Sequence, residues 1–157
     1  MSELSLFTVK QTEMTKNDHY TPKWVFDLLD VKFDLDVAAP PGGVPWIPAK
    51  RYYTQSDDGL AQPWDGFVWC NPPFNNILPW VNRLNEHKNG IALFPQTKGK
   101  WREEVWAKAD GLVETKKVNQ MQFHYLGRKD KCLFHTLFLA AWGDIGVKAL
   151  ANIGRVR

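Results

Sequence analysis

The chain has 157 residues, 44% of them hydrophobic and 13% aromatic, and its formal net charge is only +3. A chain of this length builds one globular domain with a real core and has no room for a second. It contains no uninterrupted apolar run of about 18 residues and no basic-then-apolar leader, so we expect no membrane span, no secretory signal and a cytoplasmic location. Cys70 and Cys132 have no Cys or His partner at metal-binding spacing, which favours free buried thiols and no metal site.

The first part of the chain predicts an arm, a helix and a strand. Residues 1–18 are mostly polar and aperiodic, and we expect a flexible N-terminal arm there. A helix follows, with Thr21 as its N-cap and Pro22 at its first helical position. Residues 33–37 read as a short strand, whereas the Pro- and Gly-rich residues 38–48 cannot form regular structure.

Strands and helices then alternate to the end of the chain. The expected elements are a strand at 67–70, a helix at 76–88, a strand at 90–94, a helix at 100–109 and strands at 118–126 and 132–142. The last two strands have a short connection, which makes them an antiparallel hairpin. This order predicts a compact α/β domain with a mostly parallel sheet that a C-terminal hairpin closes.

The most informative stretch is an apolar strand that stops at Asn71-Pro72-Pro73-Phe74. Each proline fixes its own φ and biases the preceding residue toward extended geometry. The Asn71 side-chain oxygen and the Pro72 carbonyl can both accept hydrogen bonds from one planar amine, while Phe74 can stack on the ring that carries it. Asn-Pro-Pro alone also forms ordinary turns. Its place between a strand and a helix, at the carboxyl end of an open sheet, favours a ligand site.

Asn71-Pro72-Pro73-Phe74 resembles the catalytic motif of amino-group methyltransferases that use S-adenosylmethionine. Over residues 18–142 the chain resembles phage-type DNA N-6-adenine methyltransferases, the Dam family of phages and prophages, because further segments follow in that family's order. These segments are His19-Tyr20-Thr21-Pro22, Leu35-Asp36-Val37-Ala38-Ala39, Tyr52-Tyr53-Thr54, Asp58-Gly59-Leu60 and Trp64. The resemblance implies a Rossmann-like class I methyltransferase fold.

The resemblance also implies a reaction: site-specific transfer of a methyl group from S-adenosylmethionine to the N6 amine of adenine in duplex DNA. The adenine would be flipped out of the duplex. Asn71, Pro72, Pro73 and Phe74 would be the catalytic residues. Asn71 and Pro72 would hold the amine and Phe74 would stack on the base, so that catalysis is mainly positioning and stabilisation of developing charge. Asn71 replaces the more usual Asp with a neutral acceptor, so proton loss is expected after methyl transfer.

The cofactor residues that the resemblance implies lie in three segments and in the catalytic motif. They are Tyr20, Thr21, Asp36, Ala38, Asp58 and Asn71. Three of them also have a plainer interpretation: Thr21 can cap its helix, Asp36 can be a strand-end carboxylate satisfied by backbone amides, and Asp58 can belong to an Asp-Asp-Gly turn. The chain has no G-x-G-x-x-G, which counts against NAD or FAD.

Basic residues are concentrated in one part of the chain. From Lys98 to Lys131 there are nine Lys or Arg against five Asp or Glu, and the rest is slightly acidic. This segment can face phosphates, or it can be a solvated surface with ordinary ion pairs. The candidates for DNA contact are Lys98, Lys100, Arg128, Lys129 and Lys131.

Only 15 residues follow Trp142, so we expect residues 19–157 to form one catalytic domain without a separate target-recognition domain. Target recognition would then come from loops, from the hairpin, from a second subunit of a homodimer or from a partner. Two other functions remain open: amino-group methylation of RNA or of a protein glutamine, and a catalytically inactive DNA-binding protein. If the chain is a DNA adenine methyltransferase, we expect a phage or prophage in a bacterial host to encode it. Its role would then be restriction-modification or regulation.

Overall fold

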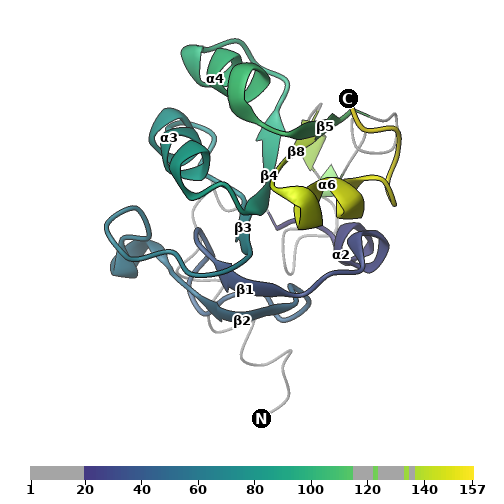
Figure 1. Ribbon diagram of the computed structural model, residues 1–157. Coiled ribbons are helices and arrows are strands. Elements are labelled where there is room, and N and C mark those ends of the chain that lie inside the picture. The colour runs from purple at the N-terminus through teal and green to yellow at the C-terminus, as the bar shows by residue number, and fades with distance from the viewer. Residues whose placement is uncertain (1–19, 115–121, 124–132, 135–136) are drawn as a thin grey trace.

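The centre of the computed structural model, which describes residues 20–114, 122–123, 133–134 and 137–157, is a six-stranded sheet (Figure 1). Its strand order is β2-β1-β3-β4-β8-β5. The strands are β1 (Phe33–Asp36), β2 (Ala49–Tyr52), β3 (Val68–Cys70), β4 (Gly90–Pro95), β5 (Gly111–Val113) and β8 (Leu137–Trp142). Strands β2, β1, β3 and β4 are parallel, and β8 is antiparallel to both β4 and β5. Strands β1, β3, β4 and β5 therefore end at the same edge of the sheet.

Helices cover both faces of this sheet, which makes three layers (Figure 1). Helices α2 (Lys23–Leu29) and α6 (Asp144–Leu150) pack on one face, and α3 (Leu78–His87) and α4 (Lys100–Lys108) pack on the other. Successive residues of a strand point to opposite faces, so each strand contributes to both cores. All six residues of β4 and all six of β8 are buried, as expected for central strands covered on both sides.

Most elements lie where the sequence predicts them, and the start of α2 is a correction. The expected N-cap, Thr21, is wrong: Pro22 is the N-cap, and no side chain caps the helix. The physical reason is that the buried Thr21 hydroxyl contacts the Asn71 side chain instead of the helix amides. Helix α3 begins two residues later than expected, at Leu78.

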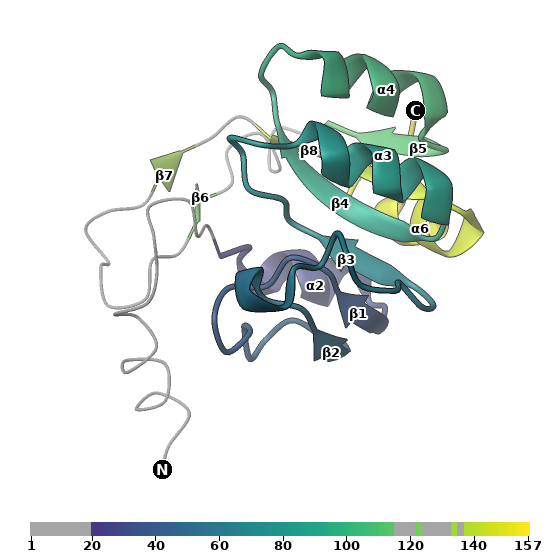
Figure 2. The ribbon, with the colours of Figure 1, turned by 90° about the vertical axis from the view of Figure 1, so that its left-hand side faces the viewer.

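The C-terminal strands differ from a simple hairpin. Strands β6 (Gln122–Phe123) and β7 (Leu133–Phe134) pair antiparallel, but they form a separate two-stranded sheet that lies apart from the main one (Figure 2). The strand that joins the main sheet here is β8, which inserts between β4 and β5 because its residues are apolar on both faces. A hairpin that closes the main sheet therefore stays a prediction. The arm at 1–18 and the hairpin tip at 127–131 lie outside the described residues.

In the part of the chain that the structure describes, two strands and one α-helix were not expected from the sequence: β2, β5 and α6. The outer side of β5 is paired with the last residue of the chain, because Leu112 and Arg157 exchange two main-chain hydrogen bonds of 3.2 and 2.9 Å. In the described part of the chain, no helix is long and apolar enough to cross a membrane.

Candidate active site

A cavity of about 410 Å³ lies where β1 and β3 end. These two strands are parallel neighbours, so the residues that follow Asp36 and Cys70 leave the sheet at the same edge. Ligands bind at this edge in open parallel sheets. The cavity is lined by residues 37–40 after β1, the loop after β2, and the Asn-Pro-Pro motif after β3. Its volume lies in the range of small-molecule sites.

The cavity brings together some of the predicted site residues and leaves others out. Those that line it are Tyr20, Ala38, Asp58, Asn71 and Pro73, whereas Thr21, Asp36, Pro72 and Phe74 do not. Thr21 and Asp36 are buried, with 1% and 3% of their surface exposed. Phe74 is half-buried and packs against the cores on both faces of the sheet.

Nine lining residues were not among the predicted site residues: Val37, Ala39, Pro40, Thr54, Gln55, Gly59, Asn75, Asn76 and Trp80. Asn75 and Asn76 directly follow the Asn-Pro-Pro-Phe motif, so their place in the sequence is a usable signal. Trp80 reaches the cavity from the first turn of α3 and is 9% exposed, and no sequence pattern separates it from an ordinary core tryptophan.

Asn71 is held by a contact from a distant part of the chain. Its Nδ2 donates a hydrogen bond to Thr21 Oγ1 over 3.4 Å. Pro72 and Pro73 follow it, and neither has a backbone N–H, so neither can donate to the Asn71 oxygen as the second residue of an Asx turn would. The nitrogen end of the amide therefore faces Thr21, and Asn71 itself is part of the cavity wall.

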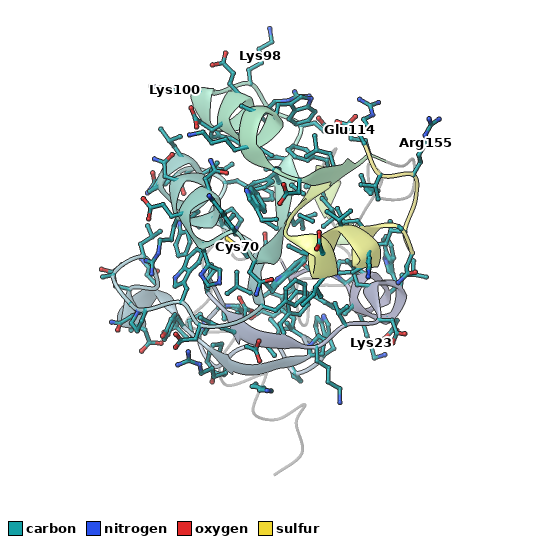
Figure 3. The ribbon with its side chains drawn as sticks, viewed as in Figure 1. Lys23, Cys70, Lys98, Lys100, Glu114 and Arg155 are labelled. Atoms are coloured by element: carbon teal, nitrogen blue, oxygen red, sulfur yellow. The ribbon has the colours of Figure 1, made fainter. Side chains whose placement is uncertain are left out.

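Asp36 is a buried carboxyl group beside the cavity rather than part of its wall. Its Oδ1 accepts a hydrogen bond of 3.2 Å from the Ala38 N–H, which is the backbone-amide contact that the sequence left open. Burial raises the pKa of Asp36 to about 7, and the Ala38 hydrogen bond only partly opposes this. Burial and the nearby Asp36 charge both raise the pKa of Cys70, which lies inside the molecule under α3 (Figure 3).

The two adjacent aspartates that precede β3, Asp57 and Asp58, have different surroundings. Asp57 Oδ2 accepts hydrogen bonds from the Thr54 N–H (2.8 Å) and Thr54 Oγ1 (3.1 Å), and so it stabilises the short 3-10 helix η2 (Gln55–Asp57). Asp58 has a left-handed backbone (φ 56°) and an exposed side chain at the cavity. The segment is therefore a turn at Asp57 and a cavity wall at Asp58.

The loop that carries Asp58 is attached to α3. Arg83 Nη1 and Nη2 donate hydrogen bonds of 2.8 Å each to the carbonyls of Leu60 and Gln62. The Arg83 guanidinium also lies 4.7 Å from the ring centroid of Trp64, whose Nε1 donates to the Gly59 carbonyl over 2.8 Å. Because α3 directly follows the Asn-Pro-Pro motif, Arg83 links the two walls of the cavity.

Comparison of the amino-acid sequence with known proteins shows the family to which the chain belongs. Residues 9–113 match the family described as DNA N-6-adenine-methyltransferase (Dam). The chain belongs to the Dam family. It is also 33% identical over 84 residues to the DNA N-6-adenine-methyltransferase of Haemophilus phage HP1 (strain HP1c1). That similarity covers 50% of this chain and 47% of the relative, so the chain spans about half the length of the curated relative that it matches.

Membership of the Dam family confirms the resemblance that the sequence indicates. The family match contains every residue that lines the cavity, from Tyr20 to Trp80. Strand β8 and helix α6 lie beyond it. The cavity is therefore built from the part of the chain that is typical of the Dam family.

The basic residues are only partly described. Lys98 and Lys100 are exposed and project from the start of α4, next to the edge where β4 ends (Figure 3). Arg128, Lys129 and Lys131 lie outside the described residues. At the same edge, Gln96 Nε2 donates a hydrogen bond to Glu114 Oε1 over 2.7 Å. Among the residues that the structure describes, no group of three or more His, Cys, Asp or Glu side chains could hold a metal ion.

Proposed function

We propose that this chain is a site-specific DNA adenine-N6 methyltransferase that uses S-adenosylmethionine. The observation that carries the proposal is the position of Asn71 and Pro73 in the wall of a strand-end cavity, in a chain of the Dam family. We also propose the Rossmann-like class I fold: four parallel strands with helices on both faces, and an antiparallel strand between β4 and β5, support it.

The chemistry of the cavity suits this cofactor. Ribose hydroxyls and an ammonium group are hydrogen-bond donors, and Asp58 places a carboxylate in the wall to accept from them. Tyr20 and Trp80 supply aromatic surface, and residues 37–40 supply backbone groups at the end of β1. Asp36 would act from behind this loop, through its charge. When bound, S-adenosylmethionine supplies an electrophilic methyl group on its sulfonium.

The residues of the motif would hold the target amine. The Asn71 side-chain oxygen and the Pro72 carbonyl would accept hydrogen bonds from the two N–H groups of the adenine amine, which would direct its lone pair into the cavity. Pro72 is buried and does not line the cavity, so its carbonyl would need to become accessible when the base binds. Holding the amine in this orientation lowers the barrier chiefly by positioning. Asn71 is neutral and cannot take up the proton, so the proton leaves to solvent after transfer. Phe74 would need to expose more of its ring to stack on a flipped base.

DNA contact is proposed for the edge where the parallel strands end. Lys98 and Lys100 are exposed there, and Arg128, Lys129 and Lys131 belong to the same basic segment of the sequence. We propose one catalytic domain at residues 19–157 behind an N-terminal arm, acting in the host cytoplasm. A homodimer or a recognition partner would supply further specificity.

The test is transfer of labelled methyl from S-adenosylmethionine to adenine in duplex DNA. We expect N-6-methyladenine with the wild type and a loss of more than about 100-fold in kcat with Asn71→Ala, because one aligned acceptor in a catalytic site contributes that much. Asn82→Ala is the matched control, since Asn82 is exposed on α3 and does not line the cavity. Cofactor binding without transfer to any DNA would contradict the proposal and would direct the search to RNA or protein amines.

A further inference from the structure

Thr21 and Asn71 are far apart in the sequence and meet at the border of the cavity. The Thr21 side chain is 1% exposed, and its hydroxyl oxygen accepts the 3.4 Å hydrogen bond from Asn71 Nδ2. The Thr21 carbonyl in turn accepts a hydrogen bond of 2.7 Å from Trp46 Nε1, which fixes the backbone at this residue. Thr21 caps no helix and lines no part of the cavity, so neither role predicted from the sequence explains its burial.

The orientation of the Asn71 amide matters because its two ends have almost the same size and opposite chemistry. The oxygen accepts a hydrogen bond from an amine, whereas the NH2 group can only donate and would meet the amine's hydrogens. A rotation of the amide by half a turn would therefore replace an attractive contact with a repulsive one. An aspartate at this position would present two equivalent oxygens and would not face this choice.

Two features of the chain bear on which end of the Asn71 amide faces the target amine. Pro72 and Pro73 have no N–H, so the local donors that commonly bind an asparagine oxygen are absent from the next two residues. Thr21 provides a hydroxyl acceptor for the nitrogen end. We propose that Thr21 is a positioning residue that orients the Asn71 amide with its oxygen toward the target amine. This inference rests on the proposed methyl transfer from an amine-holding Asn71.

The test compares Thr21→Val with Thr21→Ser. Valine matches the shape of threonine but lacks the hydroxyl, whereas serine keeps it. We expect Thr21→Val to lower kcat for DNA methylation about tenfold, the usual effect of one lost hydrogen bond, with the dissociation constant for S-adenosylmethionine unchanged. Thr21→Ser is expected to keep kcat within about twofold of the wild type. Thermal unfolding of each variant shows whether stability has changed.

A second measurement does not depend on activity. In the free protein, hydrogen exchange of the Asn71 side-chain amide protons, followed by NMR, should become faster in Thr21→Val and stay slow in Thr21→Ser. In an Asn71→Asp background, Thr21→Val should leave kcat nearly unchanged relative to Asn71→Asp alone, because a carboxylate has no wrong orientation.

Three outcomes would overturn the inference. If Thr21→Val weakens cofactor binding and keeps kcat, Thr21 serves the cofactor. If Thr21→Ser is as impaired as Thr21→Val, its role is packing. If both variants match the wild type in kcat and amide exchange, Thr21 does not orient Asn71. A wild type that methylates no DNA would instead refute the proposed function, and the exchange measurement would still decide whether Thr21 orients the amide.

Discussion

Arg83 of α3 donates one hydrogen bond to the carbonyl of Leu60 and, from its other terminal nitrogen, a second one to the carbonyl of Gln62 in the same loop. The loop also carries Asp58, and α3 begins at Leu78, shortly after the Asn-Pro-Pro-Phe motif. A planar guanidinium can hold two carbonyls at once, which a single ammonium group on a flexible stem cannot do in the same fixed geometry. The position of Asp58 relative to Asn71 therefore depends on Arg83.

Arg83→Lys should weaken cofactor binding more than it slows the reaction. We expect a rise of about 3- to 30-fold in the dissociation constant for S-adenosylmethionine, equivalent to one or two hydrogen bonds, and a much smaller change in kcat. Isothermal titration calorimetry and steady-state kinetics give the two quantities, and Asn82→Ala on the same helix is the control. A fall in kcat at unchanged affinity would show that Arg83 acts on the Asn-Pro-Pro motif instead.

Gly59→Ala should disturb the same wall of the cavity. A Cβ at Gly59 would lie 2.2 Å from the Val37 carbonyl oxygen, a distance that real side chains do not reach, so the loop must move away from the end of β1. We expect a stability loss of about 1–3 kcal/mol, as for other overpacked sites, together with weaker cofactor binding. Chemical denaturation and calorimetry would measure these effects. If Gly59→Ala keeps the stability and the cofactor affinity of the wild type, the loop can move to accommodate the Cβ without destabilising the protein, and the prediction is wrong.

The sequence predicts the central elements of the fold because their signals are local. Strands β3 and β4 are apolar runs, and β3 ends at Cys70, directly before the Asn-Pro-Pro motif, as predicted. Strand β2 gives no such signal, because Lys50, Arg51 and Tyr52 are exposed on an edge strand that pairs only with β1. The place of β8 between β4 and β5 is decided by long-range pairing, which local periodicity does not contain.

The Asp36 carboxyl should make stability depend on pH. Burial raises its native pKa from the usual 3.8 to about 7, so between these two pH values the native state binds a proton that the unfolded chain has released. The contribution of the protonated Asp36 carboxyl to the free energy of unfolding is therefore complete below about pH 4, and it is lost as the pH rises through about 7.

Asp36→Asn keeps an oxygen that can accept from the Ala38 N–H and removes the buried charge. At pH 8 we expect the ligand-free variant to be more stable than the wild type by about 1–4 kcal/mol, with little difference at pH 4. Denaturant unfolding from pH 4 to 8 checks this, with Asp27→Asn as a control because that side chain is exposed and paired with Lys23. Parallel stability curves for Asp36→Asn and the wild type would mean that Asp36 does not titrate in this range.

The candidate site is predictable from the sequence where residues adjoin the motif and unpredictable where contacts come from afar. Asn71 and Pro73 were expected at the cavity and lie there. The contact of Thr21 with Asn71 spans 50 residues of sequence, and the Arg83 contacts with Leu60 and Gln62 span 23 and 21 residues. Folding brings these pairs together through the sheet, and no spacing rule along the chain marks them.

Asp57 and Asp58 form a matched pair for the last prediction, since adjacent residues of one type have different surroundings. Asp57→Asn should cost about 0.5–1 kcal/mol of stability, because the Asp57 carboxylate binds the Thr54 N–H and hydroxyl. It should change cofactor affinity little.

Asp58→Asn should leave stability nearly unchanged, since asparagine tolerates the left-handed backbone at this residue. It should raise the dissociation constant for S-adenosylmethionine by about tenfold or more, because a charged acceptor in the cavity wall becomes neutral. Calorimetry and denaturation on both variants make the comparison. The opposite pattern, with affinity lost in Asp57→Asn and kept in Asp58→Asn, would assign the ligand contact to the turn and leave Asp58 without a role in cofactor binding.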